Sequence, residues 1–473
     1  MLFVRNYLAK RMFFCENYLE GWITAMFFTR KATQKLKEWK EKYSRSYAAL
    51  LEGPRRVGKS TIAEEFAKRE YKSYILIDFS NANSEMLSIV NDIANLDMFF
   101  IRLQTATGIR LFKGESAIIF DEIQLNPKAR QAIKHLVKDG RYDYIETGSL
   151  LSIKKNIAGI VLPSEEHKIP VHPMDYEEFL WATGKTTYPI LRDVFKARKP
   201  LGQQTNRILM RDYRLYMAVG GMPQAVDAFI QSGNFNDVDF VKRGIIDLYE
   251  DDFFRIDPSG RISMLFESIP AQLAGSSKRF SLGLALNRKA RNKDFELLYD
   301  LINSRTVQPC FRCTDPTVSL SQGKDLGKFK LYLADTGLFV SLILKTSNAT
   351  DSSLYSKMLS DKLPANLGYL YENAVAQSIT ACGRDLYYMT WNKENSTHSY
   401  EIDFLFSKGT KSVPVEVKSS RTKEHESIDA FVGKYSKTAS DACILSQKDI
   451  ERDGAIDVLP FYLSSFLFER TDG

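Results

Sequence analysis

The chain has 473 residues, of which 44% are hydrophobic and 26% are charged, and its formal net charge is +7. This length exceeds what one hydrophobic core usually serves and the composition is ordinary, so we expect about two to four folded domains and exclude a largely disordered chain. No apolar run approaches the roughly 18 residues of a membrane span, which excludes an integral membrane protein. The modest positive charge fits a nucleic-acid partner and an ordinary solvated surface equally well.

The cellular compartment is indicated by two further features. Charged residues interrupt the apolar N-terminus, so it lacks the continuous core of a secretory signal. Five cysteines, an odd number, fit a reducing compartment better than a disulfide scaffold. We therefore expect a cytoplasmic protein with no membrane partner. Cys310 and Cys313 form a lone CxxC, and a chance pair of buried residues is favoured over a zinc site because no second ligand pair lies nearby.

The order of predicted elements divides the chain into four parts. Residues 1–46 are polar and helix-prone, so we expect an N-terminal helical extension without chemistry of its own. Residues 47–174 alternate short apolar runs with helical patterns, which is typical of a parallel sheet flanked by helices. Residues 175–345 are expected to be mainly helical, and their last part, 261–345, is either a winged helix or a helical lid. A new α/β pattern then predicts a third domain over 346–473.

A phosphate-binding loop is indicated at the start of the first α/β pattern. GPRRVGKS matches G-x-x-x-x-G-K-[ST] in full and lies between an apolar strand and an amphipathic helix. Glycines allow the turns that aim backbone N–H groups at phosphates, the lysine is expected to reach the β- and γ-phosphates, and the serine to ligate Mg²⁺. We therefore expect ATP as ligand, held by Gly53, Pro54, Arg55, Arg56, Val57, Gly58, Lys59, Ser60 and Thr61.

A second motif, SAIIFDE, makes a chance match of the first one improbable. It predicts a buried strand that ends in Asp121 and Glu122, at the sheet edge where parallel sheets bind ligands. Asp121 is expected to hold Mg²⁺, directly or through water, and Glu122 to orient and deprotonate the attacking water. The alternative for Glu122 is a surface ion pair. In the next strand, Thr147 is the first choice and Ser149 the second for contact with the γ-phosphate, unless both only form a turn.

The order of these motifs resembles that of a prokaryotic family of AAA-type ATPases with a C-terminal domain of unknown function. The motifs GPRRVGKS, IIFDE, ETGS, PMDYEEF, GGMP, FKLYLADTGL, LGYLYENAVAQ, EIDFLF and VEVK carry the resemblance over residues 26–470. In similar proteins the chain begins near Met26, so residues 1–25 are expected to be an upstream extension or a misassigned start. The resemblance implies an AAA-type fold and ATP hydrolysis.

One departure from the family concerns the arginine that assists hydrolysis. Many members have Gly-Arg after the sensor strand, whereas this chain has Ala-Gly-Ile at 158–160. No arginine at this place stabilises the transferred phosphate. Arg55 and Arg56 either substitute for it or contact a neighbouring subunit, and the sequence does not choose between these roles.

The C-terminal part contains a group of acidic residues and one lysine. Alternation along the strand VPVEVKSS puts Glu416 and Lys418 on one face. Asp403 lies thirteen positions before Glu416, a spacing that suits a hairpin with both carboxylates at one metal-sized site. Glu372, on the preceding helix, is placed to complete the site. The alternative is an ordinary strand pair with surface Glu–Lys ion pairs.

This helix–strand–strand pattern resembles the restriction-endonuclease-like fold. The resemblance implies that Asp403 and Glu416 bind Mg²⁺ and that Lys418 stabilises or activates the hydrolytic water of phosphodiester cleavage. Glu372 is a further candidate catalytic residue. A nucleic-acid-binding domain without activity stays open as the alternative. If 261–345 is a winged helix, basic residues of this region are expected to contact nucleic acid: Lys278, Arg279, Arg288, Lys289 and Arg291.

The expected architecture is α/β: a P-loop NTPase of AAA type with a parallel sheet, a helical or winged-helix region, and a restriction-endonuclease-like domain. We expect a protein whose ATP state controls a nucleic-acid-acting C-terminal domain, with DNA favoured over RNA as partner and a homo-oligomer as a further expectation. The rival hypothesis is a binding switch that hydrolyses ATP slowly and has an inactive C-terminal domain. A chaperone-like or transport ATPase is disfavoured by the C-terminal residues.

Overall fold

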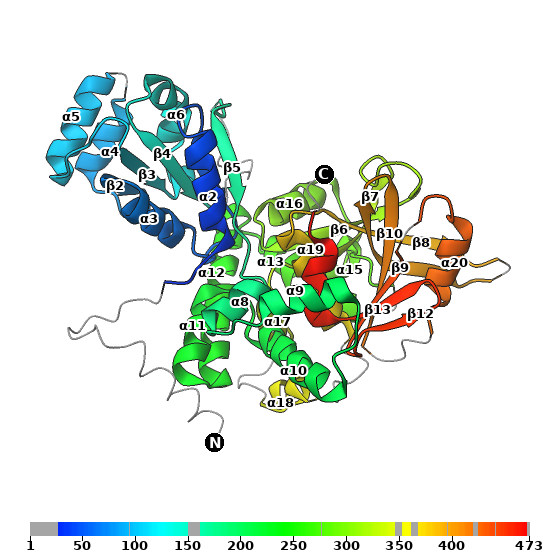
Figure 1. Ribbon diagram of the computed structural model, residues 1–473. Coiled ribbons are helices and arrows are strands. Elements are labelled where there is room, and N and C mark those ends of the chain that lie inside the picture. The colour runs from blue at the N-terminus through cyan, green and yellow to red at the C-terminus, as the bar shows by residue number, and fades with distance from the viewer. Residues whose placement is uncertain are drawn as a thin grey trace.

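The computed structural model of the chain has two lobes, a smaller N-terminal α/β lobe and a larger lobe of helices and a second sheet (Figure 1). The structure describes residues 27–93, 95–149, 161–275, 277–345, 352–360, 368–394, 396–419, 424–439 and 441–470. The expectations about residues 1–25 and about Ala-Gly-Ile at 158–160 fall outside these ranges. Among the helices in these ranges, none combines the length and apolar character needed to cross a bilayer.

Five parallel strands form the first sheet, in the order β2-β3-β4-β1-β5. They are β1 (Ala48–Glu52), β2 (Ser73–Asp78), β3 (Ser116–Asp121), β4 (Asp143–Gly148) and β5 (Glu166–Pro170). Helices between the strands are α3 (Lys59–Glu70), α4 (Ser84–Asn91), α5 (Leu96–Thr107) and α6 (Pro127–Asp139), with a short 3₁₀ turn, η2 (Ile123–Leu125). The parallel P-loop sheet predicted from the alternating pattern is confirmed.

Helices cover both faces of this sheet, which explains why its strands are continuous apolar runs. Every residue of β3 is buried, because alternate side chains pack into different hydrophobic clusters on the two faces. Helix α2 (Lys31–Lys42) lies in the segment expected to be an N-terminal helical extension, and it buries Leu36 and Trp39 against one face of the sheet. The helix is therefore part of the first lobe.

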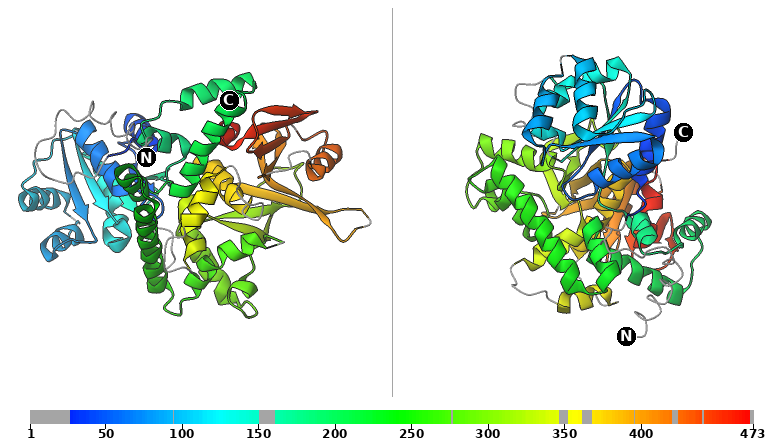
Figure 2. Two further views of the ribbon diagram at one scale, coloured as in Figure 1. Left: turned by 90° about the horizontal axis from the view of Figure 1, so that it is seen from below. Right: turned by 90° about the vertical axis from the view of Figure 1, so that its left-hand side faces the viewer.

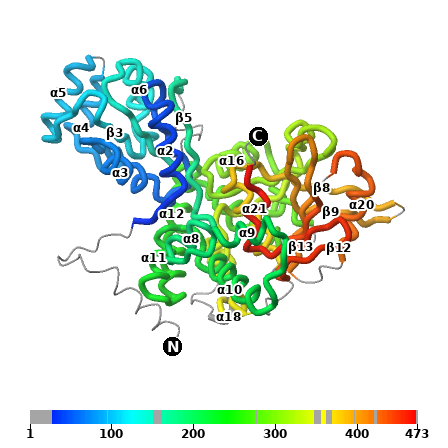
Figure 3. The backbone as a smooth tube through the Cα atoms, viewed as in Figure 1, coloured from blue at the N-terminus to red at the C-terminus, as the bar shows by residue number. Residues whose placement is uncertain are grey.

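The middle of the chain is helical, as the sequence predicts. Its helices are α8 (Tyr176–Ala182), α9 (Tyr188–Ala197), α10 (Gln203–Val219), α11 (Pro223–Ser232), α12 (Phe235–Ile256), α13 (Arg261–Glu267), α14 (Ile269–Ala274), α15 (Leu282–Ala285), α16 (Asn292–Asn303), α17 (Thr336–Leu344) and α18 (Ser352–Leu359). Figure 2 shows the two sheets on opposite sides of the long helix α12. In the chain trace, β5 leads from the first lobe into these helices (Figure 3).

The second sheet has eight strands, in the order β12-β13-β11-β10-β9-β8-β6-β7. They are β6 (Val307–Cys313), β7 (Lys324–Leu333), β8 (Leu386–Asn392), β9 (Ser399–Lys408), β10 (Lys411–Lys418), β11 (Cys443–Ser446), β12 (Glu451–Asp453) and β13 (Ile456–Pro460). The accompanying helices are α19 (Gly368–Ala381), α20 (Glu426–Lys434), η4 (Phe461–Leu463) and α21 (Ser464–Phe468).

The hairpin of β6 and β7 is not placed as a winged helix, one of the two alternatives for residues 261–345, would require. Strand β6 runs parallel to β8, with Cys310 beside Leu386, so the hairpin extends the second sheet rather than forming a wing. The boundary expected at 345/346 therefore passes through a single sheet. Local patterns predict the strands themselves, but the pairing of β6 with β8 depends on packing between distant segments.

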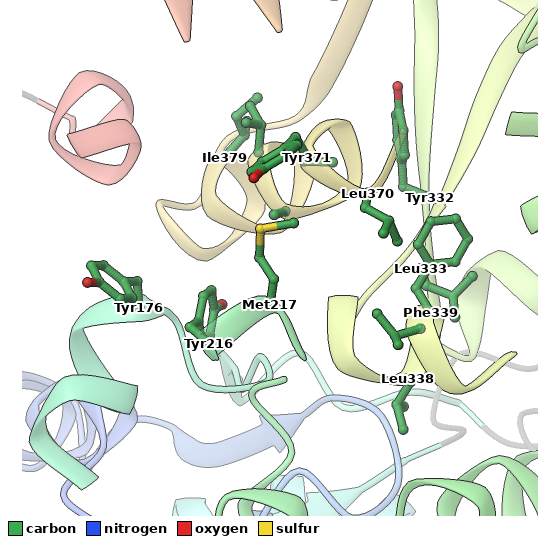
Figure 4. Close-up of a cluster of buried hydrophobic side chains, with 14 of the residues drawn as sticks. Tyr176, Tyr216, Met217, Tyr332, Leu333, Leu338, Phe339, Leu370, Tyr371 and Ile379 are labelled. Atoms are coloured by element: carbon green, nitrogen blue, oxygen red, sulfur yellow. The ribbon is translucent and has the colours of Figure 1, made fainter. Parts of the chain in front are cut away.

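One hydrophobic cluster joins the middle helices to the second sheet. Figure 4 shows side chains from α8, α10, β7, α17 and α19 gathered in this cluster: Tyr176, Tyr216, Met217, Tyr332, Leu333, Leu338, Phe339, Leu370, Tyr371 and Ile379. All of them are buried. Because the helices and the sheet share this closely packed core, we expect a shift of one of these helices to displace the sheet as well.

Candidate functional site

The loop between β1 and α3 has the backbone geometry that a phosphate-binding loop requires. A Cβ at Gly53 would lie 2.1 Å from the Val171 carbonyl oxygen, so a larger residue does not fit there. Gly58 precedes α3 with φ at 96°, a conformation that favours glycine. Lys59 opens the helix, and its ammonium donates to the carbonyl oxygens of Gly53 (3.1 Å) and Pro54 (2.9 Å).

Burial shapes the charge of this loop. The Lys59 side chain is buried, and burial lowers its pKa to about 8, although the nearby carboxylates of Glu122 and Asp121 act in the opposite direction. The ammonium therefore stays largely protonated at neutral pH. It lies beside the N-terminus of α3, which also favours negative ligands.

Three elements bring polar side chains together next to the loop. The Ser60 hydroxyl, in the first turn of α3, donates to Asp121 Oδ1 at the end of β3 (2.7 Å). The Thr147 hydroxyl, from β4, donates to the same oxygen and accepts from the Glu122 N–H (3.3 Å). Burial raises the pKa of Asp121, while its two hydroxyl donors favour the ionised form. A hydroxyl and a carboxylate in this arrangement fit Mg²⁺, which prefers oxygen ligands.

Glu122 follows directly and has an unusual backbone. Its φ of 52° is in the left-handed region, which is uncommon for a residue with a side chain and is frequent at functional sites. The carboxylate accepts from the Gln124 side-chain amide and from the Ser149 hydroxyl (3.4 Å). Thus Thr147 contacts Asp121, whereas Ser149, the second choice for the sensor position, contacts Glu122.

The acidic residues of the second sheet also lie close together. Glu416 and Lys418 are on β10, with the ammonium 3.0 Å from Glu416 Oε2. The backbone N–H of Val417 donates to Asp403 Oδ2 on β9 (2.9 Å). Burial raises the pKa of Glu416 to about 7, and the negative charge of Asp403 adds to this shift, which Lys418 opposes. Asp403 and Glu416 therefore influence each other's charge.

Two further lysines enter this cluster from outside the expected C-terminal domain. Lys330 on β7 is fully buried, with its ammonium 2.7 Å from Glu401 Oε1 and 3.8 Å from Asp403 Oδ1. Lys278, between α14 and α15, forms an ion pair with Glu372. Burial disfavours both ammonium groups, but their acidic neighbours outweigh it and raise the pKa of each lysine.

The positions of these two lysines bear on whether the carboxylates of the cluster can bind a divalent metal ion. One oxygen of Glu372 meets Lys278 and the other accepts from the Tyr332 hydroxyl (3.3 Å). Lys330 supplies positive charge beside Asp403. Within the described part of the chain, no group of three or more His, Cys, Asp or Glu side chains is arranged to hold a metal ion. In this arrangement Lys278 pairs with Glu372 and Lys330 lies beside Asp403, so two of the carboxylates expected at the magnesium site have ammonium neighbours. The magnesium site of Glu372 with Asp403 and Glu416 stays a prediction.

The basic residues expected to contact nucleic acid divide into two groups. Lys278 is engaged by Glu372, and Arg288 donates to both oxygens of Asp294, each at 2.8 Å. The other three are exposed: Arg279, Lys289 and Arg291.

Three family models match the chain in succession. An AAA domain matches residues 45–180, and two domains of unknown function, DUF8612 and DUF4143, match residues 210–350 and 367–463. The chain carries an AAA-type ATPase domain. This is the part of the recognised resemblance that is confirmed, and the ATPase domain contains the loop, the strand-end carboxylates and Thr147. None of the curated proteins matches the chain.

Solved structures with some likeness to the chain include other ATPases. A Walker-type ATPase of Pyrococcus abyssi is 17% identical, with 67% of this chain and 96% of that chain covered and a TM-score of 0.41. Cdc6p of Pyrobaculum aerophilum is 11% identical, with 75% and 98% covered and a TM-score of 0.24. The RuvB Holliday junction branch migration motor of Thermotoga maritima is 14% identical, with 59% and 89% covered and a TM-score of 0.26. At these values the likeness says nothing about substrate or partner.

The sequence did not indicate the buried arginine next to the loop of the ATPase domain. Arg30, just before α2, donates to the Val57 carbonyl (2.9 Å) and the His172 carbonyl (2.6 Å), and it pairs with Glu178 on α8 (3.1 Å). It thus ties the phosphate loop to the first middle helix. The sequence around Arg30 has the charge pattern of a solvent-exposed helix. Burial of one arginine does not change the periodicity of that pattern, so the sequence gives no sign of it.

The ATPase domain also has a cavity beside the loop that is large enough for part of a ligand. The cavity has a volume of about 190 Å³. Its lining is largely apolar and comes from both lobes: Phe27, Phe28, Arg30, Gly58, Thr61, Ile62, Met174, Pro223, Gln224 and Asp227. A flat apolar group next to bound phosphates would be shielded from water there.

Helix α12 contributes two contacts to the loop that the sequence did not predict. The Arg55 guanidinium pairs with Asp252 Oδ1 (2.9 Å), and the Tyr249 hydroxyl donates to the Arg55 carbonyl oxygen (3.1 Å). Asp252 and Tyr249 lie almost 200 positions after Arg55 in the chain, so a local sequence motif does not predict these contacts. The ATPase domain is therefore joined to the middle helices at the phosphate loop itself.

Proposed function

We propose that the chain binds ATP with Mg²⁺ and hydrolyses it at the site formed by the phosphate loop and the end of β3. One observation carries this proposal: the Ser60 hydroxyl and the Asp121 carboxylate meet at 2.7 Å, next to the buried ammonium of Lys59. Ser60 and Asp121 are the residues that would hold Mg²⁺. When bound, the ion neutralises phosphate charge and orients the phosphates.

The other side chains have separate tasks in this proposal. Lys59 turns from the loop carbonyls to the β- and γ-phosphates, since its flexible stem lets the ammonium follow the strongest negative charge. Glu122 orients the attacking water and accepts its proton. Ser149 and Gln124 hold the Glu122 carboxylate in place. The cavity beside Gly58 and Thr61 takes the base of the nucleotide.

For the second sheet, we propose a nucleic-acid-binding domain that does not cleave its ligand, with DNA favoured over RNA. The residues expected to cleave are present, but Lys278 and Lys330 neutralise two of the carboxylates. A magnesium-dependent nuclease needs these carboxylate oxygens for its ion. Exposed Arg279, Lys289 and Arg291 supply a surface for phosphates. The nucleotide state of the ATPase domain then controls this binding.

ATP turnover and DNA binding by the purified full-length chain test the two parts of the proposal. We expect magnesium-dependent phosphate release, with DNA affinity that differs between ATP and ADP. Absence of ATP binding by the folded protein would refute the first part. Identical DNA affinity with ATP, with ADP and without nucleotide would refute the control of the second sheet while leaving the first part intact.

A further inference from the structure

The phosphate loop has a charged partner in α12 that the proposed mechanism does not use. The side chain of Asp252 is buried, yet it carries a carboxylate whose partners are the guanidinium groups of Arg55 at 2.9 Å and of Arg255 at 3.4 Å. Burying a carboxylate is costly unless it is paired with positive charge. Asp252 therefore depends on arginine, and one of its arginines belongs to the loop expected to bind phosphate.

Asp252 also lies within the electric field of the catalytic groups. Its charge acts on Lys59 together with those of Glu122 and Asp121. Conversely, the charge of Glu122 acts on Asp252, whose pKa is raised mainly by burial while Arg55 opposes the rise. The carboxylate is thus close enough to phosphate chemistry for an added negative charge to disturb it.

The same face of α12 holds the backbone of the loop. Tyr249 lies one turn before Asp252, and its hydroxyl donates to the Arg55 carbonyl oxygen at 3.1 Å. Tyr249 is buried in the core of the middle helices. Arg55 is therefore held at two points by one helix, through its backbone and through its side chain.

At its other end α12 is fixed to the helix that follows β7. Asp239 accepts from the Ser341 hydroxyl on α17 (2.6 Å) and from the Tyr355 hydroxyl on α18 (3.1 Å). The Lys242 ammonium donates to Tyr355 (2.9 Å) and to the Ala218 carbonyl. We therefore expect a displacement of α12 at the loop to move α17 as well, and to move the second sheet through the shared core.

We propose that Arg55 exchanges Asp252 for the γ-phosphate of ATP. When no γ-phosphate is bound, the Arg55–Asp252 ion pair holds α12 to the loop, and binding of the γ-phosphate breaks this pair and releases α12. This inference rests on the proposed ATP site and adds its regulation. A guanidinium binds phosphate through two parallel N–H donors, and the γ-phosphate brings more negative charge than one carboxylate. Asp252, left beside the phosphates, is repelled. Asp252 is thus a positioning residue, and Arg55 is the residue that discriminates ATP from ADP.

Nucleotide affinities of four full-length variants test the exchange, with fluorescent ATP and ADP analogues as probes. Asp252→Asn keeps the shape of the side chain but frees Arg55, so ATP should bind about five- to ten-fold more tightly and ADP should change less than two-fold. Arg55→Ala should lose most of the preference for ATP, and the double variant should resemble it. Asp251→Asn, an exposed neighbour on the same helix, removes the same charge and should match the wild type.

Hydrogen exchange along α12 supplies a second readout that a merely structural ion pair would not change. In the wild type, residues 249–256 should exchange faster with ATP and Mg²⁺ than with ADP and Mg²⁺, whereas Asp252→Asn should show the faster exchange with either nucleotide. Equal loss of ATP and ADP affinity in Asp252→Asn, or no change in either, would overturn the inference. Failure of wild type to bind ATP would instead overturn the proposed function.

Discussion

The Ser60 hydroxyl donates a 2.7 Å hydrogen bond to the Asp121 carboxylate, which joins the first turn of α3 to the end of β3. Thr147 donates to the same carboxylate oxygen from β4. Helix α3 and the neighbouring strands β3 and β4 thus converge on a single oxygen of Asp121, near Lys59. Such an arrangement is preorganised, because the side chains are held by packed strands rather than by mobile loops.

Replacing Lys59 by Ala is predicted to abolish tight ATP binding. The change removes a buried ammonium that the β- and γ-phosphates need, and we expect about a 100-fold loss of affinity, which corresponds to ~3 kcal/mol. Titration with a fluorescent ATP analogue measures the loss, and circular dichroism checks the fold. Lys68→Ala, an exposed lysine of the same helix, is the matched control. Wild-type affinity in folded Lys59→Ala would contradict the site.

Replacing Glu122 by Gln is predicted to separate binding from turnover. The amide keeps the shape of the side chain but cannot accept a proton from water, so kcat should fall about 10²- to 10⁴-fold while ATP affinity stays within about two-fold. Phosphate release under single-turnover conditions measures the chemical step. If turnover stays near that of the wild type, the base is a different group.

The second sheet should make stability depend on pH through Glu416. Its pKa in the folded protein, about 7, lies above the usual 4.5, so the folded state binds a proton more tightly than the unfolded state. The resulting stabilisation is present below pH 4.5 and is lost as pH rises to about 7, by up to ~3 kcal/mol. Glu416→Gln should remove this loss in urea unfolding at pH 5 and pH 7.5. Exposed Glu394→Gln should keep the wild-type pH profile, and an unchanged profile in Glu416→Gln would refute the prediction.

Magnesium-dependent cleavage of DNA is predicted to be absent in the wild type. Lys278 and Lys330 neutralise Glu372 and Asp403, so the oxygens are not free for an ion. Linear, nicked and single-stranded substrates should survive incubation with Mg²⁺, with and without ATP, in a preparation that hydrolyses ATP. Cleavage that disappears in Asp403→Ala while ATP turnover persists would show that the nuclease interpretation is right.

Binding of DNA should depend on the exposed arginines and lysine around α15 and α16. Neutralising Arg279, Lys289 and Arg291 together should weaken binding by about ten-fold or more at low salt and reduce the slope of log affinity against log salt. Fluorescence anisotropy at several salt concentrations measures both. The matched control neutralises three exposed lysines of α6: Lys128, Lys134 and Lys138. An equal effect of the two triple variants would show that DNA binds through the overall positive charge of the protein, and would contradict a binding site at Arg279, Lys289 and Arg291.

Part of the nucleotide site could be derived from the sequence, because it depends on neighbours along the chain. Gly53, Gly58, Lys59 and Ser60 belong to one loop and one helix turn, and the local backbone sets their geometry. Asp121 was predictable because a continuous apolar run shows where a buried strand ends. Alternation along β10 likewise put Glu416 next to Lys418, and they form an ion pair.

Only the tertiary structure decided which distant charges enter these sites. Arg30 and Asp252 reach the phosphate loop, and Lys278 and Lys330 reach the second sheet, from segments without a recognisable motif. A buried charge needs a partner nearby in space but not in sequence, so its position follows from the packing of whole elements. The pairing of β6 with β8 has the same origin: it places the β6–β7 hairpin in the second sheet and brings Lys330 beside Asp403, one of the residues expected to bind a metal ion.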